Sequence, residues 1–161
     1  MKLIIESWNR YLSESETGFY GTTTPFDSFD ISRPTEFGYH FGLDPEQSKH
    51  RIGNKGIVYK VNLNYSSPLK MRDVLRWDLG NVLGELGENR ETISNLDREA
   101  VKRARKNFSS RRVEQNLVLA DYLSSKGYDA IEYDNEGESG GAAVILWEPK
   151  RMKIVGQIDV G

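Results

Sequence analysis

The clearest pattern along the chain is an alternation of apolar and polar side chains at residues 57–63. Apolar residues stand at every second position, which predicts a half-buried β-strand: Ile57, Tyr59, Val61 and Leu63. Shorter runs of β-branched, apolar or aromatic residues predict further strands at 22–24, 38–42, 128–133, 142–147 and 152–155. Strands are therefore expected towards both ends of the chain.

The middle of the chain, from about residue 71 to residue 126, has apolar side chains at helical intervals. The pattern predicts a first helix that ends near Leu86, a second over 92–107 and a third over 110–126. Asp44 and Pro45 are preferred residues for an N-cap and a first helical position, so a further helical turn is expected there. Helices between two groups of strands indicate an α+β fold.

The pattern of side chains at residues 1–14 predicts a short amphipathic helix that precedes the main domain. Its apolar residues fall on one face at helical spacing: Ile4, Ile5, Trp8, Tyr11 and Leu12. We interpret 1–14 as a leader, which a protease could remove, and 15–161 as a single domain. A polar stretch at 13–18 is expected to separate the leader from the domain.

Composition narrows the kinds of chemistry that the chain can perform. Its 161 residues are enough for one domain with a core, and the longest apolar run, 142–147, is too short to cross a membrane. There are no cysteines and two histidines outside any metal-ligand spacing, so no metal site is predicted. The net charge of −2 gives no global basic field, although the basic run 98–112 could contact nucleic acid or an acidic partner.

Three clusters of residues could carry chemistry. They are Phe19-Tyr20-Gly21-Thr22, Gly38-Tyr39-His40-Phe41-Gly42 with the nearby Ser48, and Asp134-Asn135-Glu136-Gly137-Glu138. Each also has a purely structural interpretation: a strand entry, an aromatic core strand and an acidic turn. A glycine permits close approach to the backbone, aromatic rings stack on a flat heterocycle, and a carboxylate stabilises a developing positive charge.

Together the clusters resemble the motifs of the ADP-ribosyltransferase superfamily, in particular its small bacteriophage-encoded members. The last motif of that family is a G-Y-D-aliphatic strand followed by an N-E-acidic loop, and 127–131 with Asn135-Glu136 is similar to it. The similarity extends over roughly residues 19–156. It implies a split β-structure that holds NAD between two sheets, here with a helical insertion in the middle of the chain.

The resemblance also implies a role for each motif residue. Gly21 would hold the nicotinamide through its backbone, and Thr22 would belong to the same NAD-binding motif. Tyr20 would contact the NAD ribose as a catalytic residue, and Glu136 would be the catalytic carboxylate. His40 and Phe41 belong to the stacking motif, and Ser48 would lie near the nicotinamide. The chain departs from the family at Tyr20, His40 and Arg51, where a histidine or arginine and two tyrosines are usual. Three further carboxylates compete with Glu136 for its role: Glu132, Asp134 and Glu138.

The resemblance implies a mono-ADP-ribosyltransferase that uses NAD as co-substrate and needs no metal. The expected acceptor is a host protein or a nucleic-acid base, and the protein is expected to be a monomer. The leader ends in Leu12-Ser13-Glu14 and is similar to the capsid-targeting leaders of T4-type phage internal proteins, which implies a location in the phage virion and the host cytoplasm. The alternative is a catalytically inactive member of the fold that serves as a binding module or virion component.

Overall fold

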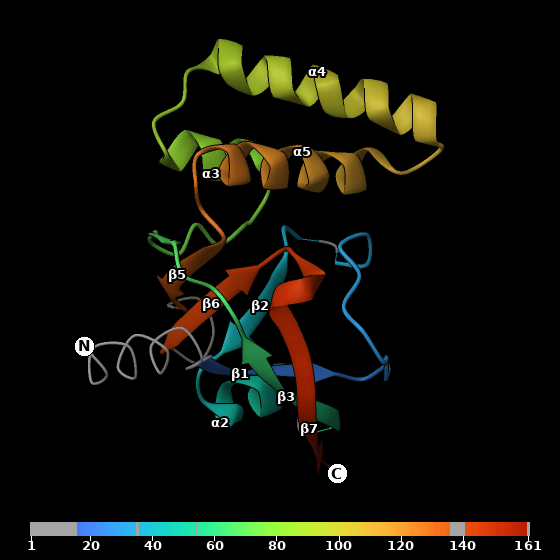
Figure 1. The fold of residues 1–161 in the computed structure, drawn as a ribbon, viewed down its shortest axis with the longest axis vertical. Coiled ribbons are helices and arrows are strands. Elements are labelled where there is room, and N and C mark those ends of the chain that lie inside the picture. Colours follow the sequence, from blue (N-terminus) through green and yellow to red (C-terminus); the bar gives the residue numbers. More distant parts are fainter. Residues whose placement is uncertain (1–15, 35, 54, 136–140, 161) are drawn as a thin grey trace, which may run out of the picture.

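A computed structural model describes residues 16–34, 36–53, 55–135 and 141–160. The predicted leader at 1–14 lies outside the described residues, and so do Glu136 and Glu138. The described part combines helices with one mixed sheet and is therefore α+β, as the sequence predicted (Figure 1).

Within the described residues one sheet contains seven strands in the order β4-β5-β6-β2-β1-β3-β7. Neighbouring strands are antiparallel except β4 and β5, which are parallel. The strands are β1 (Glu16–Thr22), β2 (Tyr39–Gly42), β3 (Gly56–Leu63), β4 (Pro68–Lys70), β5 (Ala130–Asp134), β6 (Ala142–Leu146) and β7 (Met152–Val160).

The helices are α2 (Pro45–Arg51), α3 (Leu79–Glu85), α4 (Arg90–Asn107), α5 (Arg111–Ser125) and the 3-10 turn η1 (Pro149–Arg151). Their N-termini follow the capping chemistry of the sequence. Asp44 accepts the N–H of Glu46 at 2.9 Å, and Ser110 accepts the N–H of Val113 at 3.2 Å. The helices predicted at 44–45, 92–107 and 110–126 are thereby confirmed to within one or two residues.

The helix predicted from residue 71 is wrong at its beginning, because α3 starts at Leu79. The carboxylate of Asp73 accepts the N–H of Leu75 at 2.8 Å, a local bond that competes with helical pairing. Leu75 also has a φ of 65°, which a right-handed helix excludes. The helix begins only after Asp78, which accepts the N–H of Asn81 at 2.8 Å.

The first strand also differs from its prediction, since β1 covers Glu16–Thr22 rather than 22–24. Its polar beginning was predicted to be a linker, yet it pairs with β3 along its full length. Gly18 explains part of this result. A Cβ there would lie 2.6 Å from Cδ1 of Leu63 and 2.9 Å from Cβ of Phe41, so the missing side chain lets neighbouring strands pack closely.

The core is divided between the two faces of the sheet. On one face buried residues of α3, α4 and α5 form one apolar cluster with those of β5 and β6. Helix α5 lies between α4 and the sheet, and α4 packs on α5 (Figure 1). The other face carries an aromatic cluster: Phe29, Tyr39, Phe41 and Tyr59, with Tyr20 and Phe26 at its border. Successive residues of β2 and β5 alternate between the two faces, as a strand requires.

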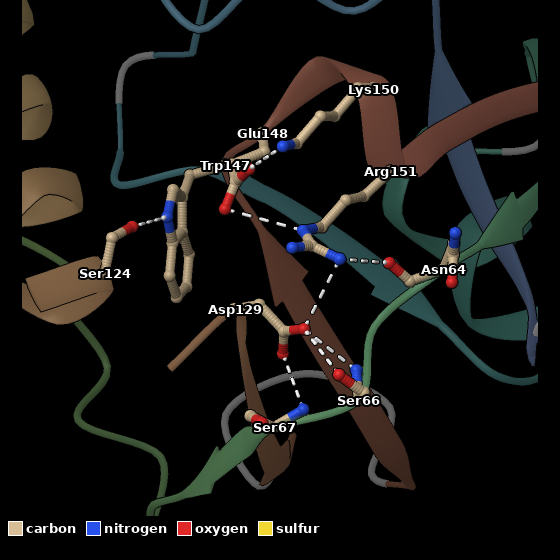
Figure 2. Close-up of polar contacts among 9 residues, drawn as sticks. All are labelled: Asn64, Ser66, Ser67, Ser124, Asp129, Trp147, Glu148, Lys150 and Arg151. Atoms are coloured by element: carbon tan, nitrogen blue, oxygen red, sulfur yellow. Dashed lines mark hydrogen bonds and ion pairs between the residues drawn. The ribbon is translucent and has the colours of Figure 1, made fainter. Parts of the chain in front are cut away.

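Asp129 of the predicted G-Y-D motif has a structural role, shown in Figure 2. Its buried carboxylate accepts the backbone N–H groups of Ser66 and Ser67, both at 2.8 Å, and lies 3.4 Å from Nη1 of Arg151. These contacts fasten the turn between β3 and β4, and the start of β7, to the beginning of β5. The motif therefore fixes the strand that leads towards Asn135 and Glu136.

Strands β1 and β2 separate close to their single registered pair. Only Phe19 and Gly42 are in register, whereas β1 pairs with β3 at seven successive positions. The two strands run in clearly different directions in Figure 1, and α2 packs beside them. The geometry leaves a recess between β1, β2 and α2.

Candidate functional site

The recess contains two adjoining cavities, which we call the Gly21 slot and the His40 cavity. The Gly21 slot is lined by Gly21, His40, Phe41, Gly42, Gln47, Ser48, Arg51, Tyr133, Asn135 and Ala143. The His40 cavity, of about 210 Å³, is lined by Glu36, His40, Arg51, Asp73, Leu75, Trp77, Tyr133 and Asn135. Residues of all three predicted clusters thus meet in one place.

Gly21 and Ser48 define how α2 sits on β1. A Cβ on Gly21 would lie 2.6 Å from the backbone oxygen of Ser48, so the helix approaches as closely as a glycine permits. The buried Ser48 hydroxyl donates a hydrogen bond to the Phe19 carbonyl at 2.9 Å. Because that hydroxyl has given its proton to the strand, it can offer a ligand only an acceptor.

His40 forms the wall that the two cavities share. Its Nε2 donates to the Phe37 carbonyl at 3.0 Å, which assigns the tautomer, and its Nδ1 therefore accepts from the Tyr133 hydroxyl at 2.9 Å. Burial lowers the pKa of His40 to about 3, with a smaller contribution from the charge of Arg51. The ring is thus neutral at pH 7, and the Glu36 carboxylate 4.0 Å from Nε2 does not form an ion pair with it.

The His40 ring is largely covered by its neighbours. Trp77 and Tyr133 both meet it edge to face, with ring centroids 5.7 Å and 5.8 Å away. Only 9% of the side chain is exposed, so the ring offers a ligand a small part of its surface. Its neutral form places no charge against a ligand ring, and its two hydrogen bonds hold the imidazole in one orientation.

Arg51 brings a positive charge to this recess. It ends α2 and lines both cavities, and no other lysine or arginine occurs among the described residues that line them. Its charge lowers the pKa of His40 and opposes the rise that burial causes in the pKa of Tyr20. Arg51 therefore lies close enough to both side chains to affect their ionisation. Sequence reasoning noted Arg51 as a departure from the family pattern and did not count it among the site residues.

The opposite wall was also missed by sequence reasoning, because its segment was predicted as helix. Asp73, Leu75 and Trp77 lie between β4 and α3 and line the His40 cavity. Leu75 is 69% exposed and has a positive φ, an uncommon conformation for a leucine and one that is concentrated at functional sites. The Asp73 turn described above holds it there.

Tyr20 and Thr22 are not among the described residues that line either cavity. The Tyr20 ring points to the other face of the sheet, where its centroid lies 5.4 Å from that of Tyr39 and 5.9 Å from that of Phe41. Burial raises the pKa of Tyr20. The Thr22 hydroxyl donates to the carbonyl of Thr24 at 2.9 Å. Phe41 lines the slot, although its ring belongs to the same aromatic cluster as Tyr20.

Two of the three carboxylates that compete with Glu136 lie away from this recess. Glu132 and Asp134 line a different cavity, of about 370 Å³, which also contains Tyr65 and Glu16. The alternation of β5 explains this, because Tyr133 between them points to the His40 side. The Tyr65 hydroxyl donates to the carboxylates of Glu16 and Glu132, and the pKa of Tyr65 is raised by burial and by these acidic neighbours.

The loop that contains Glu136 begins and ends beside the Gly21 slot. Asn135 lines the slot, and its N–H donates to the Gly141 carbonyl at 2.9 Å. A Cβ on Gly141 would lie 2.1 Å from Nε2 of Gln47, another residue of the slot. Both ends of segment 136–140 are therefore anchored at the recess that contains Gly21 and His40.

Two classes of feature are not found in the part of the chain that the structure describes. No group of three or more histidine, cysteine, aspartate or glutamate side chains is arranged to hold a metal ion. None of the described helices is long and apolar enough to span a membrane.

Comparison with known proteins gives one solved structure of low similarity. No protein-family model matches the chain, and no curated protein matches it. The solved structure is entitled "Crystal structure of an anti-CRISPR protein". It is 13% identical in sequence, with a TM-score of 0.45 over 91% of this chain and 98% of that chain. A likeness this low supports no inference about fold or function.

Proposed function

We propose that the protein is a mono-ADP-ribosyltransferase that transfers ADP-ribose from NAD to a host macromolecule. One observation supports this proposal above the others. Gly21, His40 and Asn135, which belong to three separated sequence clusters, line one recess, and Glu136 follows Asn135 directly.

The proposed fold type is the split β-structure of ADP-ribosyltransferases, with NAD bound where β1 and β2 separate. The single registered pair between these strands is consistent with such a split. The His40 cavity alone is smaller than a usual ligand site of about 300–1,000 Å³. The Gly21 slot adds only about 20 Å³, so most of a dinucleotide would lie over the mouth of the recess rather than inside it.

In the proposed reaction the nicotinamide–ribose bond breaks and the ribose develops positive charge. Glu136 would stabilise that charge, as carboxylates do in glycoside chemistry. The protein's remaining work is orientation, for which the rigid α2–β1 contact at Gly21 and Ser48 is suited. Arg51 would attract the pyrophosphate, because guanidinium groups form strong charge-assisted hydrogen bonds with phosphates.

The proposed acceptor is a host protein, with a nucleic-acid base as the second possibility. The resemblance of the leader supports a protein that is carried in a phage virion and acts in the host cytoplasm. For the transfer itself a monomer suffices, since the recess is formed by residues of one chain.

The direct test is incubation of the purified protein with biotin-labelled NAD and bacterial lysate, followed by detection of labelled macromolecules. The variant Glu136→Gln is expected to lose about a hundredfold or more in rate, because a transition-state contact is removed. Glu132→Gln and Asp134→Asn are matched controls that line the other cavity and should label at close to the wild-type rate.

Each outcome of this test bears on a different part of the proposal. Equal labelling by wild type and Glu136→Gln would contradict the assignment of the catalytic carboxylate. Absence both of labelling and of nicotinamide release by the wild type would contradict the transferase itself.

An inactive binding module of the same fold is the second candidate function. The position of Tyr20 favours it, because the ring that would replace the family's ribose-contacting histidine or arginine packs in the aromatic cluster. Calorimetric titration with NAD, combined with chromatographic detection of free nicotinamide, separates the two candidates. A module would bind NAD without releasing nicotinamide, whereas the transferase would do both.

A further inference from the structure

The connection between α4 and α5 has features that the fold does not require. We call residues 102–112 the hairpin tip; they contain six lysines and arginines and no aspartate or glutamate, although the whole chain has a net charge of −2. In Figure 1 this connection lies at the end of the helical layer, above the sheet. Four of these cations lie in the last turns of α4 and two in the first turn of α5, on either side of the connecting residues 108–110. Arg103 and Arg111 are paired with carboxylates of the two helices.

Phe108, in the middle of the hairpin tip, is unusual in two respects. Its side chain is 96% exposed, the highest value among the large exposed hydrophobic residues of the described chain. It also caps α4 in the left-handed conformation, with φ 55° and ψ 28°, where glycine or asparagine is preferred. A bulky aromatic residue there contributes neither burial nor good backbone geometry, so its presence calls for an explanation outside the fold.

The hairpin tip is held rigidly. Arg111 and Gln115 of α5 both bond to Asp97 of α4, and Arg103 of α4 bonds to Asp121 of α5 at 2.9 Å. Inside the turn, the Ser109 hydroxyl donates to the buried carboxylate of Glu114. Phe108 is therefore presented on a braced support, which lowers the entropic cost of binding anything to it.

Three exposed cations lie in the last two turns of α4, before Phe108. Lys102, Arg105 and Lys106 lie three and four residues apart, so they share one helix face, and all three are exposed. No ion pair to these three side chains is found within the described residues. The end of α4 thus presents solvated cations within six residues of a solvated aromatic ring.

We infer that the hairpin tip is a binding site for single-stranded nucleic acid. Cations that follow the phosphate backbone and an aromatic ring that stacks on a base are the two components of such sites. A protein partner fits less well, because protein interfaces surround their aromatic anchors with apolar residues that exclude water. The neighbours of Phe108 in sequence are Asn107, Ser109 and Ser110, and the other exposed large hydrophobic residues, Leu75 and Val155, lie on other elements. The inference does not depend on ADP-ribosylation.

The test measures the affinity of the full-length protein for a fluorescein-labelled single-stranded oligonucleotide by anisotropy at several salt concentrations. Phe108→Asn is expected to weaken binding about tenfold, since a stacked base is lost. Its melting temperature should stay unchanged or rise, because asparagine tolerates the left-handed conformation and no buried surface is removed. A merely structural role of Phe108 would predict the opposite result for stability.

Two matched variants complete the design. Val155→Asn also replaces an exposed apolar residue, on β7 and away from both the hairpin tip and the recess, and it should leave oligonucleotide affinity unchanged. The double variant K102Q/K106Q should reduce the salt slope, d log K/d log[salt], by about 1.4, because two phosphate contacts are lost at about 0.7 each. Lys55→Gln with Lys60→Gln removes the same charge from β3 and its approach, and should change neither slope nor affinity appreciably.

Equal oligonucleotide affinity for wild type and Phe108→Asn would overturn the inference. It would also be overturned if K102Q/K106Q and the Lys55, Lys60 variant weakened binding equally, since only net charge would then matter. Displacement of the oligonucleotide by polyglutamate at equal charge concentration, independently of Phe108, would instead assign the surface to an acidic protein.

Discussion

Gly21 offers a direct test of how α2 is seated on β1. In the variant Gly21→Ala the new methyl group would lie 2.6 Å from the backbone oxygen of Ser48 and 3.0 Å from Cγ2 of Ile52. Both distances are well below an ordinary carbon contact, and the closer atom belongs to the backbone, which cannot rotate away. The helix must therefore move off the strand, and the Ser48 hydrogen bond to the Phe19 carbonyl, at 2.9 Å, is strained with it.

The size of the effect follows from these contacts. Forcing one methyl group into a packed site costs about 1–3 kcal/mol. A chain of this length loses about 2–4 °C in melting temperature per kcal/mol, so Gly21→Ala should lower Tm by roughly 2–12 °C. Because α2 forms one side of the recess, the same change should weaken any ligand that occupies the Gly21 slot.

Gly84→Ala provides a matched control for this experiment. Gly84 lies inside α3, and a Cβ there would meet nothing within 4 Å. Alanine in a helix is more stable than glycine by up to about 1 kcal/mol, so this variant should raise Tm. The assay is thermal unfolding of both variants followed by circular dichroism. A wild-type Tm for Gly21→Ala would refute the close approach of α2 to β1.

Three further predictions follow from the same contacts. Asp129→Ala should destabilise the protein by about 3 kcal/mol in denaturant unfolding, because it leaves two backbone donors and a cation without their carboxylate, and Asp129→Asn should lose less. His40 has a pKa of about 3 in the folded protein and near 6.5 when unfolded, so between these values only the unfolded state binds the extra proton. The free energy of unfolding should therefore fall as pH drops from about 6.5 towards 3, and in pH-dependent unfolding His40→Gln should lack this component. Arg51→Gln should raise the pKa of His40 in NMR titration, since a nearby positive charge is removed, and on the proposed function it should weaken NAD binding about tenfold.

Local chemistry explains which elements could be predicted from the sequence. Asp44 and Ser110 cap helices with their own side chains, and the alternation at 57–63 reflects a strand buried mainly on one face. Such signals are contained within a few residues. The polar start of β1 and the non-helical segment 71–78 could not be predicted in this way, because distant strands and a single side-chain bond at Asp73 decide them.

Part of the candidate site could also be predicted from the sequence, and part could not. The motif resemblance predicted that Gly21, His40 and Ser48 lie together, and all three line one slot. The order of the motifs alone does not fix this, because the order of strands in the sheet differs from their order along the chain. The face on which each side chain lies depends on strand pairing, and this separates Tyr20 from Gly21 although they are neighbours in sequence. Arg51 enters the recess only because α2 ends there, a fact that no local pattern contains.

These placements decide which residues can test the proposed function. Gly21 and Ser48 are already required for seating α2, so a loss of activity on changing them would not distinguish a ligand contact from a displaced helix. Arg51 is exposed at the end of its helix, so its replacement removes less buried surface than a change at Gly21 or Ser48. A variant at Arg51 that folds normally, yet binds NAD as tightly as the wild type, would therefore count against a dinucleotide in this recess more strongly than any change in the glycine motif.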